Sequence, residues 1–346
     1  MVRNSQLKIG VVLKPLFLDR AGGLQTQVIE TIAALRDIDI QVIKLTAENN
    51  NLAEISCIHI FDSEGTDDAM KWAKRLGKPV VLSPVIAPTW TGRKARKAEL
   101  VSSFARWFTN NRVHTTFELE KNTIKSADRL VALSTAERSV LLSAFDADPT
   151  RIRIIPNGVN SVFFDARPEL FSERYGLEPG FVLCVGSIYP YKNQLGLAEA
   201  LKGTKKQIVL IGREFDPGSG YLAQTLKFKN VTHIGTLPSN DPLLAAAYAA
   251  AGVLAVPSVS EVFPLVVLEA LAAGTPVVLT KNTALDIEAI MQHVTLVDAS
   301  SPAQIAHAIS TALAIPNDRI LLSASVRDLE WKKVALSLGE MYEELL

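Results

Sequence analysis

The feature that most constrains the fold is a regular alternation of short, β-branched apolar runs with stretches of helical periodicity. The predicted strands of the first half are residues 8–13, 40–45, 56–61, 79–83 and 128–134, and those of the second half are 181–187, 206–212, 231–236, 253–258, 276–280 and 294–299. Strands that are separated by helices build parallel sheets with helices on both faces. We therefore expect an α/β chain of two doubly wound units.

Local signals mark several helix starts. Thr66, which precedes two aspartates, predicts the start of a helix, and Ser134 and Glu137 have the spacing of a capping box. Pro242 and Pro302 each follow a residue of the capping type, so both are predicted to begin helices.

The domain boundary is expected where Pro156, Asn157 and Gly158 end a strand with turn-forming residues. A chain of 346 residues has the length of about two domains. A hinge at this position would leave a cleft between the domains. Ligands of open parallel sheets bind at the carboxyl ends of the strands, so we expect the site in that cleft.

Charge and cysteine content exclude several classes of protein. The net charge is zero, but residues 1–157 carry 22 Lys and Arg against 17 Asp and Glu, an excess of five, and residues 158–346 carry 14 against 19. This excess is too small for a nucleic-acid-binding surface, although it favours an anionic partner for the first half. Cys57 and Cys184 lie in separate apolar runs and are expected to be core thiols. With no signal peptide and no membrane span expected, we predict a cytoplasmic protein.

The segment 260–279 holds two carboxylates, Glu261 and Glu269, in an almost wholly apolar run. We predict a loop that carries Glu261 after a strand, then a helix that starts at Pro264 and stops at Gly274. A carboxylate accepts several hydrogen bonds and can therefore hold a vicinal diol of a ribose or a hexose. Alternatively, Glu261 caps the helix and Glu269 is a solvated helix residue. A phosphate beside two glutamates needs a cation, and Lys192 is the candidate.

The same residues resemble a known family. The stretch 257–278 is similar to the Pro-Ser-x-x-Glu-x7-Glu signature of retaining glycosyltransferases of family 4, which have the GT-B fold of two Rossmann-like domains with an interdomain cleft. The similarity extends to residues 21–36, 127–134, 154–160 and 185–193. The resemblance implies an N-terminal acceptor-binding domain over 1–157 and a nucleotide-sugar-binding domain over 158–328. It also implies a helix over 329–346 that crosses back to the first domain.

The resemblance assigns roles to individual residues. Glu269 would hold the nucleotide ribose, and Glu261 the transferred sugar or the adjacent diphosphate. Lys192 would neutralise the leaving diphosphate. The remaining donor contacts would come from Leu237 beside the base and from the backbone of Gly22, Gly23, Phe263, Leu265 and Val266.

The sequence departs from this family at three places. Ser187 and Tyr191 stand where the family commonly has an Arg, so Arg213 is predicted to compensate as a catalytic cation. Val262 replaces a usual Gly, and Pro264 lacks an amide. Ser83 and Pro84 stand where many members have a His after the fourth strand.

The resemblance also implies the chemistry. The leaving phosphate is expected to deprotonate the acceptor, which would be a hydroxyl of a glycan, a lipid-linked molecule or a small molecule. No protein base, metal or other cofactor is expected, and the aspartates of 37–39 and 146–148 are interpreted as surface residues. The alternatives are a catalytically silent sugar-binding module and a phosphorylase or epimerase of the same fold. The chain lacks the Gly-x-Gly-x-x-Gly of a dinucleotide oxidoreductase.

Two further features carry separate predictions. His59 lies in a buried strand pattern, which favours a hydrogen-bonded core histidine over a functional one. Residues 91–108 combine a basic start with Leu100, Phe104, Trp107 and Phe108 on one helical face. Such a helix either buries its apolar stripe or, as a helix on the acceptor side, makes peripheral contact with an anionic membrane or a polyanionic acceptor.

Overall fold

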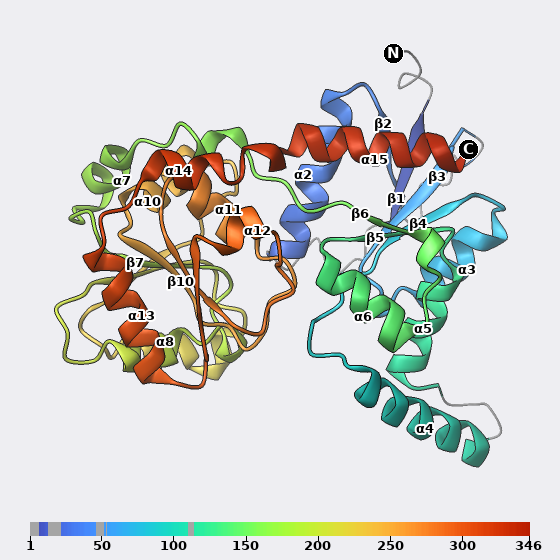
Figure 1. Cartoon of the computed structure of the whole chain (residues 1–346), viewed down its shortest axis with the longest axis horizontal. Helices are drawn as coiled ribbons and strands as arrows, with labels where there is room; N and C mark the ends of the chain where they lie inside the picture. The colour runs from blue at the N-terminus through green and yellow to red at the C-terminus, as the bar shows by residue number, and fades with distance from the viewer. Residues whose placement is uncertain (1–6, 13–21, 46–51, 53, 110–113) are drawn as a thin grey trace. The chain divides into compact units, whose positions relative to one another are not determined.

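The computed structural model describes residues 7–12, 22–45, 52, 54–109 and 114–346, and its elements are labelled in Figure 1. The described parts of residues 1–19, 28–157 and 332–346 form one compact unit, and those of 20–27 and 158–331 form the other. We refer to these as unit 1 and unit 2. The predicted α/β fold is confirmed by a six-stranded, all-parallel sheet in each unit.

The sheet of unit 1 has the strand order β2-β1-β3-β4-β5-β6. Its strands are β1 (Lys8–Val12), β2 (Gln41–Leu45), β3 (Cys57–Phe61), β4 (Val80–Ser83), β5 (Arg129–Ala132) and β6 (Ile152–Ile154). Its helices are α3 (Asp67–Arg75), α4 (Gly92–Thr109), α5 (Thr116–Ser126), α6 (Thr135–Phe145), and most of α2 (Gly23–Asp37) and α15 (Trp331–Leu345). The start of α2, up to Gln27, and Trp331 of α15 belong to unit 2. The order reverses between β1 and β3, which makes this pair the topological switch point of unit 1.

The sheet of unit 2 has the order β12-β11-β10-β7-β8-β9. Its strands are β7 (Val182–Val185), β8 (Ile208–Ile211), β9 (Val231–Gly235), β10 (Val253–Val256), β11 (Val277–Thr280) and β12 (Val294–Val297). Its helices are α7 (Pro168–Tyr175), α8 (Gln194–Ala200), α9 (Tyr221–Thr225), α10 (Pro242–Ala250), α11 (Leu265–Ala272), α12 (Glu288–Met291), α13 (Pro302–Ala314) and α14 (Arg319–Ala324). Here the switch point lies between β10 and β7.

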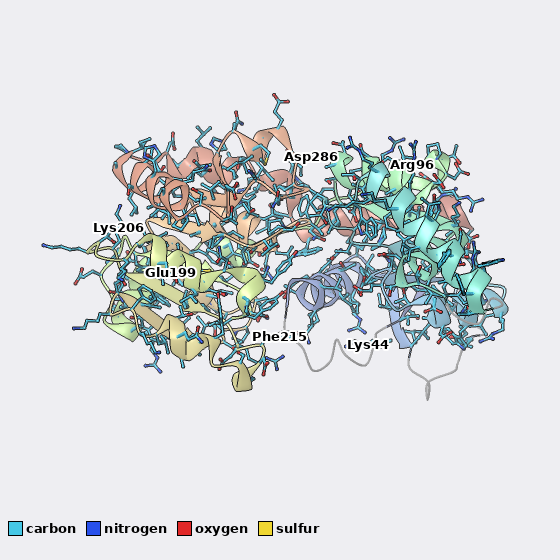
Figure 2. All side chains as sticks on the ribbon, turned by 90° about the horizontal axis from the view of Figure 1, so that it is seen from below. Lys44, Arg96, Glu199, Lys206, Phe215 and Asp286 are labelled. Carbon is cyan, nitrogen blue, oxygen red and sulfur yellow. The ribbon has the colours of Figure 1, made fainter. Side chains whose placement is uncertain are left out.

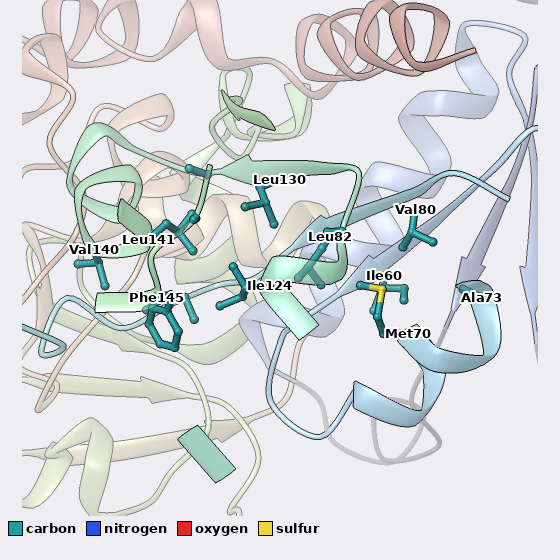
Figure 3. Close-up of a cluster of buried hydrophobic side chains, with 14 of the residues drawn as sticks. Ile60, Met70, Ala73, Val80, Leu82, Ile124, Leu130, Val140, Leu141 and Phe145 are labelled. Atoms are coloured by element: carbon teal, nitrogen blue, oxygen red, sulfur yellow. The ribbon is translucent and has the colours of Figure 1, made fainter. Parts of the chain in front are cut away.

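The inner strands β3, β4, β10 and β11 are buried because both faces of each sheet are covered, which explains why most of them read as continuous apolar runs. The edge strands β2, β6, β9 and β12 are partly exposed. In unit 1, one core cluster packs α3, α5 and α6 against one face of the sheet (Figure 3). Ile60 and Leu82 contribute from the strands, Met70 from α3, Ile124 from α5 and Phe145 from α6. Cys57 and Cys184 are free thiols buried in the two units, as predicted.

The predicted helix starts are confirmed, with one correction. Ser134 accepts a hydrogen bond from the amide of Glu137, and α10 and α13 begin at Pro242 and Pro302. Thr66 precedes α3, but its hydroxyl donates to the carbonyls of Asp62 and Ser63 instead of accepting from the helix. The Thr66 hydroxyl therefore bonds to the preceding loop and does not cap the helix.

His59 is a core histidine, as its strand pattern predicted. Its ring nitrogens lie 2.7 Å from the hydroxyl of Tyr342 on α15 and 2.9 Å from that of Ser83. Burial lowers the pKa of His59 to about 3. The neutral ring therefore joins the last helix to β3 and β4 inside unit 1.

This lowered pKa predicts how stability depends on pH. An unfolded histidine titrates near pH 6.5, so between about pH 6.5 and 3 the unfolded chain binds one proton more than the folded chain at His59. The contribution of His59 to stability should therefore fall as the pH falls through this window, by up to about 1.4 kcal/mol per pH unit. His59→Gln should flatten this slope in urea unfolding series, while His307→Gln, at an exposed position, should not. Equal slopes in wild type and His59→Gln would contradict the assignment.

Candidate functional site

The strands at the switch point of unit 2 lead into the segments that carry the predicted cation and carboxylate. Lys192 follows β7, and Glu261 follows β10. The two strands are parallel neighbours, so both segments leave the same edge of the sheet. At a switch point, the connections of neighbouring strands run in opposite directions and leave a crevice that binds ligands in open α/β sheets.

Lys192 and Glu261 form a direct ion pair. The ammonium nitrogen lies 2.6 Å from Oε1 of Glu261, and the side chains are 27% and 11% exposed. Burial alone would lower the pKa of Lys192, but the charge and hydrogen bond of Glu261 outweigh it, so the pKa lies above its usual value. The lysine is therefore a fixed, partly desolvated cation.

The backbone of the two segments holds this pair in place. The amide of Val259 donates to the carbonyl of Tyr191 at 2.9 Å. Asn193 adopts a left-handed conformation, with φ of 58°, and its side-chain amide donates to the carbonyls of Pro257 and Ala299. Asparagine tolerates this conformation better than most residues. It ties the lysine segment to the loops after β10 and β12.

A glycine pair allows the neighbouring loops to approach closely. Gly186 and Gly212 follow β7 and β8 and have φ values of 140° and 151°. A Cβ atom on Gly212 would lie 1.9 Å from the carbonyl oxygen of Gly186, so no other residue fits there. This contact sets the start of the segment that leads to Lys192.

Glu269 lies in the same strand–loop–helix corner as Glu261, on α11. Its side chain is buried, with 8% exposure, and Oε2 accepts a hydrogen bond of 2.5 Å from the hydroxyl of Tyr248 on α10. The alternative of a solvated helix residue is therefore wrong for Glu269. The alternative of a helix cap is wrong for Glu261, because Pro264 occupies the N-cap position.

The start of α11 presents backbone amides a few residues after Glu261 in the sequence. Leu265 and Val266 are its first two residues, where a helix offers no internal acceptors for the amides. The amide of Val267 donates to the carbonyl of Pro264. Phe263 is buried just before the helix, so its ring anchors the loop.

The two segments that carry the ion pair also hold polar atoms that are buried without partners among the described residues. In the described part of the chain, Oε1 of Gln194 and the hydroxyls of Ser258 and Ser260 have no hydrogen-bond partner. Such groups cost about 1–3 kcal/mol each. Ser258 and Ser260 belong to the β10 segment, and Gln194 to the lysine segment. Both segments thus keep unused hydrogen-bonding capacity.

Arg213 and Leu237 follow the carboxyl ends of β8 and β9, the two strands on the side of β7 away from β10. Arg213 follows β8, with an exposed side chain and a backbone carbonyl that accepts from the amide of Ile188. The next residues carry an aromatic stack in which Phe215, labelled in Figure 2, packs on Tyr189. Leu237 is half-buried after β9, two strands from β7 and therefore about 10 Å away across the sheet.

Gly22 and Gly23 stand at the start of α2, and both are exposed. The carbonyl of Gly22 accepts from the amide of Thr26. Among the described residues, a Cβ atom on either glycine would have no neighbour within 4 Å. The loop 13–21 that precedes them lies outside the described residues.

Glu137 in unit 1 is a buried carboxylate, which its sequence pattern did not indicate. Its oxygens accept hydrogen bonds of 2.7 Å from the amides of Ile86 and Leu133, and burial raises its pKa to about 7. The neighbouring Val85 has a φ of 55°, which is strained for a β-branched residue. Glu137 therefore supports a strained turn at the carboxyl end of β4, although its sequence context showed only a capping box.

No metal site is assembled in the described ranges, where no three His, Cys, Asp or Glu side chains converge. The aspartates of the two Asp-x-Asp stretches lie at element ends. Asp37 ends α2, Asp146 caps α6, and Asp148 caps the following turn.

Comparison with known proteins bears on the two units separately. Residues 168–326 match the family model "Glycosyl transferases group 1", and residues 54–163 match "Glycosyltransferase Family 4". The chain belongs to the group 1 glycosyltransferases, with the GT-B fold. The resemblance of the glutamate segment therefore agrees with the family models that match residues 54–163 and 168–326.

Two solved structures share the fold over nearly the whole chain. A sucrose-phosphate synthase from Thermosynechococcus elongatus has a TM-score of 0.75 and 21% identity, covering 98% of this chain and 99% of that one. The Anabaena protein HepE in complex with UDP has a TM-score of 0.70 and 15% identity, covering 98% and 100%. At these identities the likeness concerns the fold alone.

Curated relatives are similar over a shorter part of their sequences. The D-inositol 3-phosphate glycosyltransferase of Salinispora arenicola is 31% identical over 254 residues, which is 65% of this chain and 56% of that protein. The Corynebacterium glutamicum protein of the same name is 28% identical over 252 residues, 66% and 60% of the two chains. The chain thus spans less than two thirds of either relative.

Proposed function

We propose that this protein is a retaining glycosyltransferase of class EC 2.4, of the hexosyltransferase type. It moves a sugar from a nucleotide-diphosphate sugar to a hydroxyl of a glycan, lipid-linked or small-molecule acceptor. In this proposal unit 2 binds the donor and unit 1 binds the acceptor. Membership of the group 1 glycosyltransferase family supports the reaction class.

The observation that carries the proposal is the Lys192–Glu261 ion pair at the switch point of unit 2. A lysine held there can contact a diphosphate, and its positive charge stabilises the negative charge that develops as the phosphate leaves. Glu261 keeps the ammonium group in place and has its second oxygen for a sugar hydroxyl. Glu269, on the helix that follows, is proposed to hold the ribose diol.

In the proposed reaction, the bond between the anomeric carbon and the phosphate oxygen breaks while the acceptor oxygen bonds to the same face of that carbon. The acceptor proton moves to the leaving phosphate, so the step balances without a protein base. We propose that the N-terminal amides of α11, at Leu265 and Val266, and those of Gly22 and Gly23 contact the diphosphate. Arg213 is proposed to add a second positive charge, and Leu237 to lie beside the base. No metal or cofactor takes part in this scheme.

The acceptor is proposed to carry several hydroxyl groups. The curated relatives are named for D-inositol 3-phosphate, which makes this molecule the first soluble acceptor to test.

The test is to incubate the protein with UDP-, GDP- and ADP-sugars, with and without D-inositol 3-phosphate or a glycan acceptor. We expect one donor to release its nucleoside diphosphate faster with an acceptor, and NMR to show that the new bond keeps the anomeric configuration of the donor. Nucleotide binding without turnover of any donor would favour the catalytically silent module. An inverted product would contradict the retaining mechanism.

We also propose that the protein acts at the cytoplasmic face of a membrane, through peripheral contact of residues 91–108 with anionic lipid. In the described part of the chain, no helix has both the length and the apolar character required to cross a bilayer. The proposed contact is therefore in the plane of the surface.

A further inference from the structure

We infer that the acceptor is amphiphilic and is taken from an anionic bilayer on which α4 lies. This inference rests on the proposed function and names its acceptor class, in contrast to the water-soluble acceptor in the names of the curated relatives. It follows from the outward face of α4, from the charge on that face, and from the place where α4 leaves the sheet.

The outward face of α4 is unusually apolar. Five large hydrophobic side chains are each 62–73% exposed, namely Leu100, Val101, Phe104, Trp107 and Phe108. At about 100° per residue, these positions lie within an arc of about 120°. Phe104, Trp107 and Phe108 also contact one another, with ring centroids 4.5–6.2 Å apart. This arrangement is a continuous exposed aromatic patch.

The opposite side of α4 holds the helix to unit 1, so the patch is not the packing face. Ala95 and Ser102 are buried, and the Ser102 hydroxyl lies 2.5 Å from that of Thr115. Arg106 forms an ion pair of 3.0 Å with Glu118 on α5. The sequence alternative in which the apolar stripe is buried is therefore wrong.

The same outward face is basic near the start of the helix. Arg93, Lys94, Arg96 and Lys97 are exposed, and Arg96 is labelled in Figure 2. The only acidic residue of α4, Glu99, forms an ion pair with Lys121 on α5. A second copy docked on this face would therefore bury these cations without an acidic partner from α4. Anionic headgroups neutralise such cations, and acyl chains accept the aromatic side chains.

The start of α4 lies close in sequence to the carboxyl edge of the sheet of unit 1. Residues 84–91 join the end of β4 to Gly92, and Glu137 supports this connection through the amide of Ile86. Ligands of open α/β sheets bind at this edge. A bilayer that holds α4 would therefore present amphiphilic molecules beside the proposed acceptor region, and a water-soluble acceptor would not need such a surface.

The first measurement is binding to vesicles of phosphatidylglycerol and phosphatidylcholine without nucleotide. We expect Trp107 fluorescence to shift to the blue with anionic vesicles.

The triple variant Phe104→Ser/Trp107→Ser/Phe108→Ser should weaken co-sedimentation with the vesicles about 100-fold or more. The basic quadruple variant, Arg93→Ser, Lys94→Ser, Arg96→Ser and Lys97→Ser, should lose the preference for anionic lipid. Ile320→Ser, at another exposed apolar position, is the matched control and should bind normally. Unchanged binding of the variants, or a dimer that the triple variant abolishes, would overturn the inference.

The second measurement identifies the acceptor class. The donor is a radiolabelled nucleotide sugar whose nucleotide stabilises the protein, and the acceptors are D-inositol 3-phosphate and vesicles of a total lipid extract. We expect label in the organic phase, with a loss of at least about tenfold in the triple variant. Transfer to the soluble acceptor alone, unaffected by the triple variant, overturns only this inference. Absence of nucleotide binding would overturn the proposed function and this inference together.

Discussion

Lys192→Ala is expected to lower the kcat of sugar transfer about 10²- to 10³-fold, while the dissociation constant of the donor changes much less. The ammonium group lies 2.6 Å from Glu261 at the switch point of unit 2, where it can meet the charge of a leaving diphosphate. Because this charge grows as the bond breaks, losing the cation costs more in the transition state than in the bound ground state. Steady-state kinetics with the preferred donor, alongside calorimetric binding of the nucleotide, separate the two effects.

A matched control is Lys281→Ala. Lys281 forms an ion pair of 2.7 Å with Asp298 in the same unit, after the neighbouring strand β11, but has no proposed role. Its loss should leave kcat unchanged. Equal kinetics of wild type and Lys192→Ala would remove Lys192 from the mechanism. A loss of kcat together with a collapse of the melting temperature would indicate a structural role of the ion pair.

Glu269→Ala should raise the dissociation constant of the nucleotide about 100-fold. The ribose hydroxyls lose two hydrogen bonds to a carboxylate, and at the lower end of the usual range, about 1.5 kcal/mol each, the loss is about 3 kcal/mol or roughly a factor of 100. The buried position of Glu269, with 8% exposure, makes these bonds stronger than they would be in water. Isothermal titration with the nucleotide is the measurement, and a deoxyribose analogue should lose affinity for wild type but little for the variant.

The matched control for Glu269 is Tyr248→Phe. The Tyr248 hydroxyl donates to the carboxylate of Glu269 at 2.5 Å. The variant removes this hydrogen bond but leaves the carboxylate able to accept hydrogen bonds from the ribose. We expect affinity within about tenfold of wild type. If both variants lost the same affinity, Glu269 would act by supporting the α10–α11 contact and not by holding the ribose.

The fold could be predicted from the sequence because buried parallel strands leave a simple pattern. Strands such as β7 and β10 are short apolar runs with β-branched residues, and Gly274, with φ of 76°, ends α11 where the turn residue was expected. The strand order is not local information. That β7 lies beside β10, which is what brings Lys192 and Glu261 together, depends on pairing between residues about 70 positions apart in the sequence.

The surroundings of the site were harder to predict for the same reason. Tyr248 lies in an alanine-rich helix, and its sequence context does not indicate that its hydroxyl contacts Glu269. The side chain of Asn193 bonds to backbone carbonyl groups of two loops. Every residue has such a carbonyl group, so the sequence does not indicate these partners. For α4 the sequence does show the apolar stripe, because its residues recur at helical spacing. It does not show whether other parts of the protein cover that stripe.

The most direct test of the proposed donor site is a thermal-shift panel with UDP, GDP, ADP, dTDP and CMP on wild type and Glu269→Ala. A nucleotide at about 100 times its dissociation constant adds about 2.7 kcal/mol of stability, so binding is readily seen. We predict that one nucleotide diphosphate stabilises wild type and that this stabilisation is lost in the variant. Stabilisation by none of them, or an equal shift in both proteins, would contradict a nucleotide-sugar site built around Glu269.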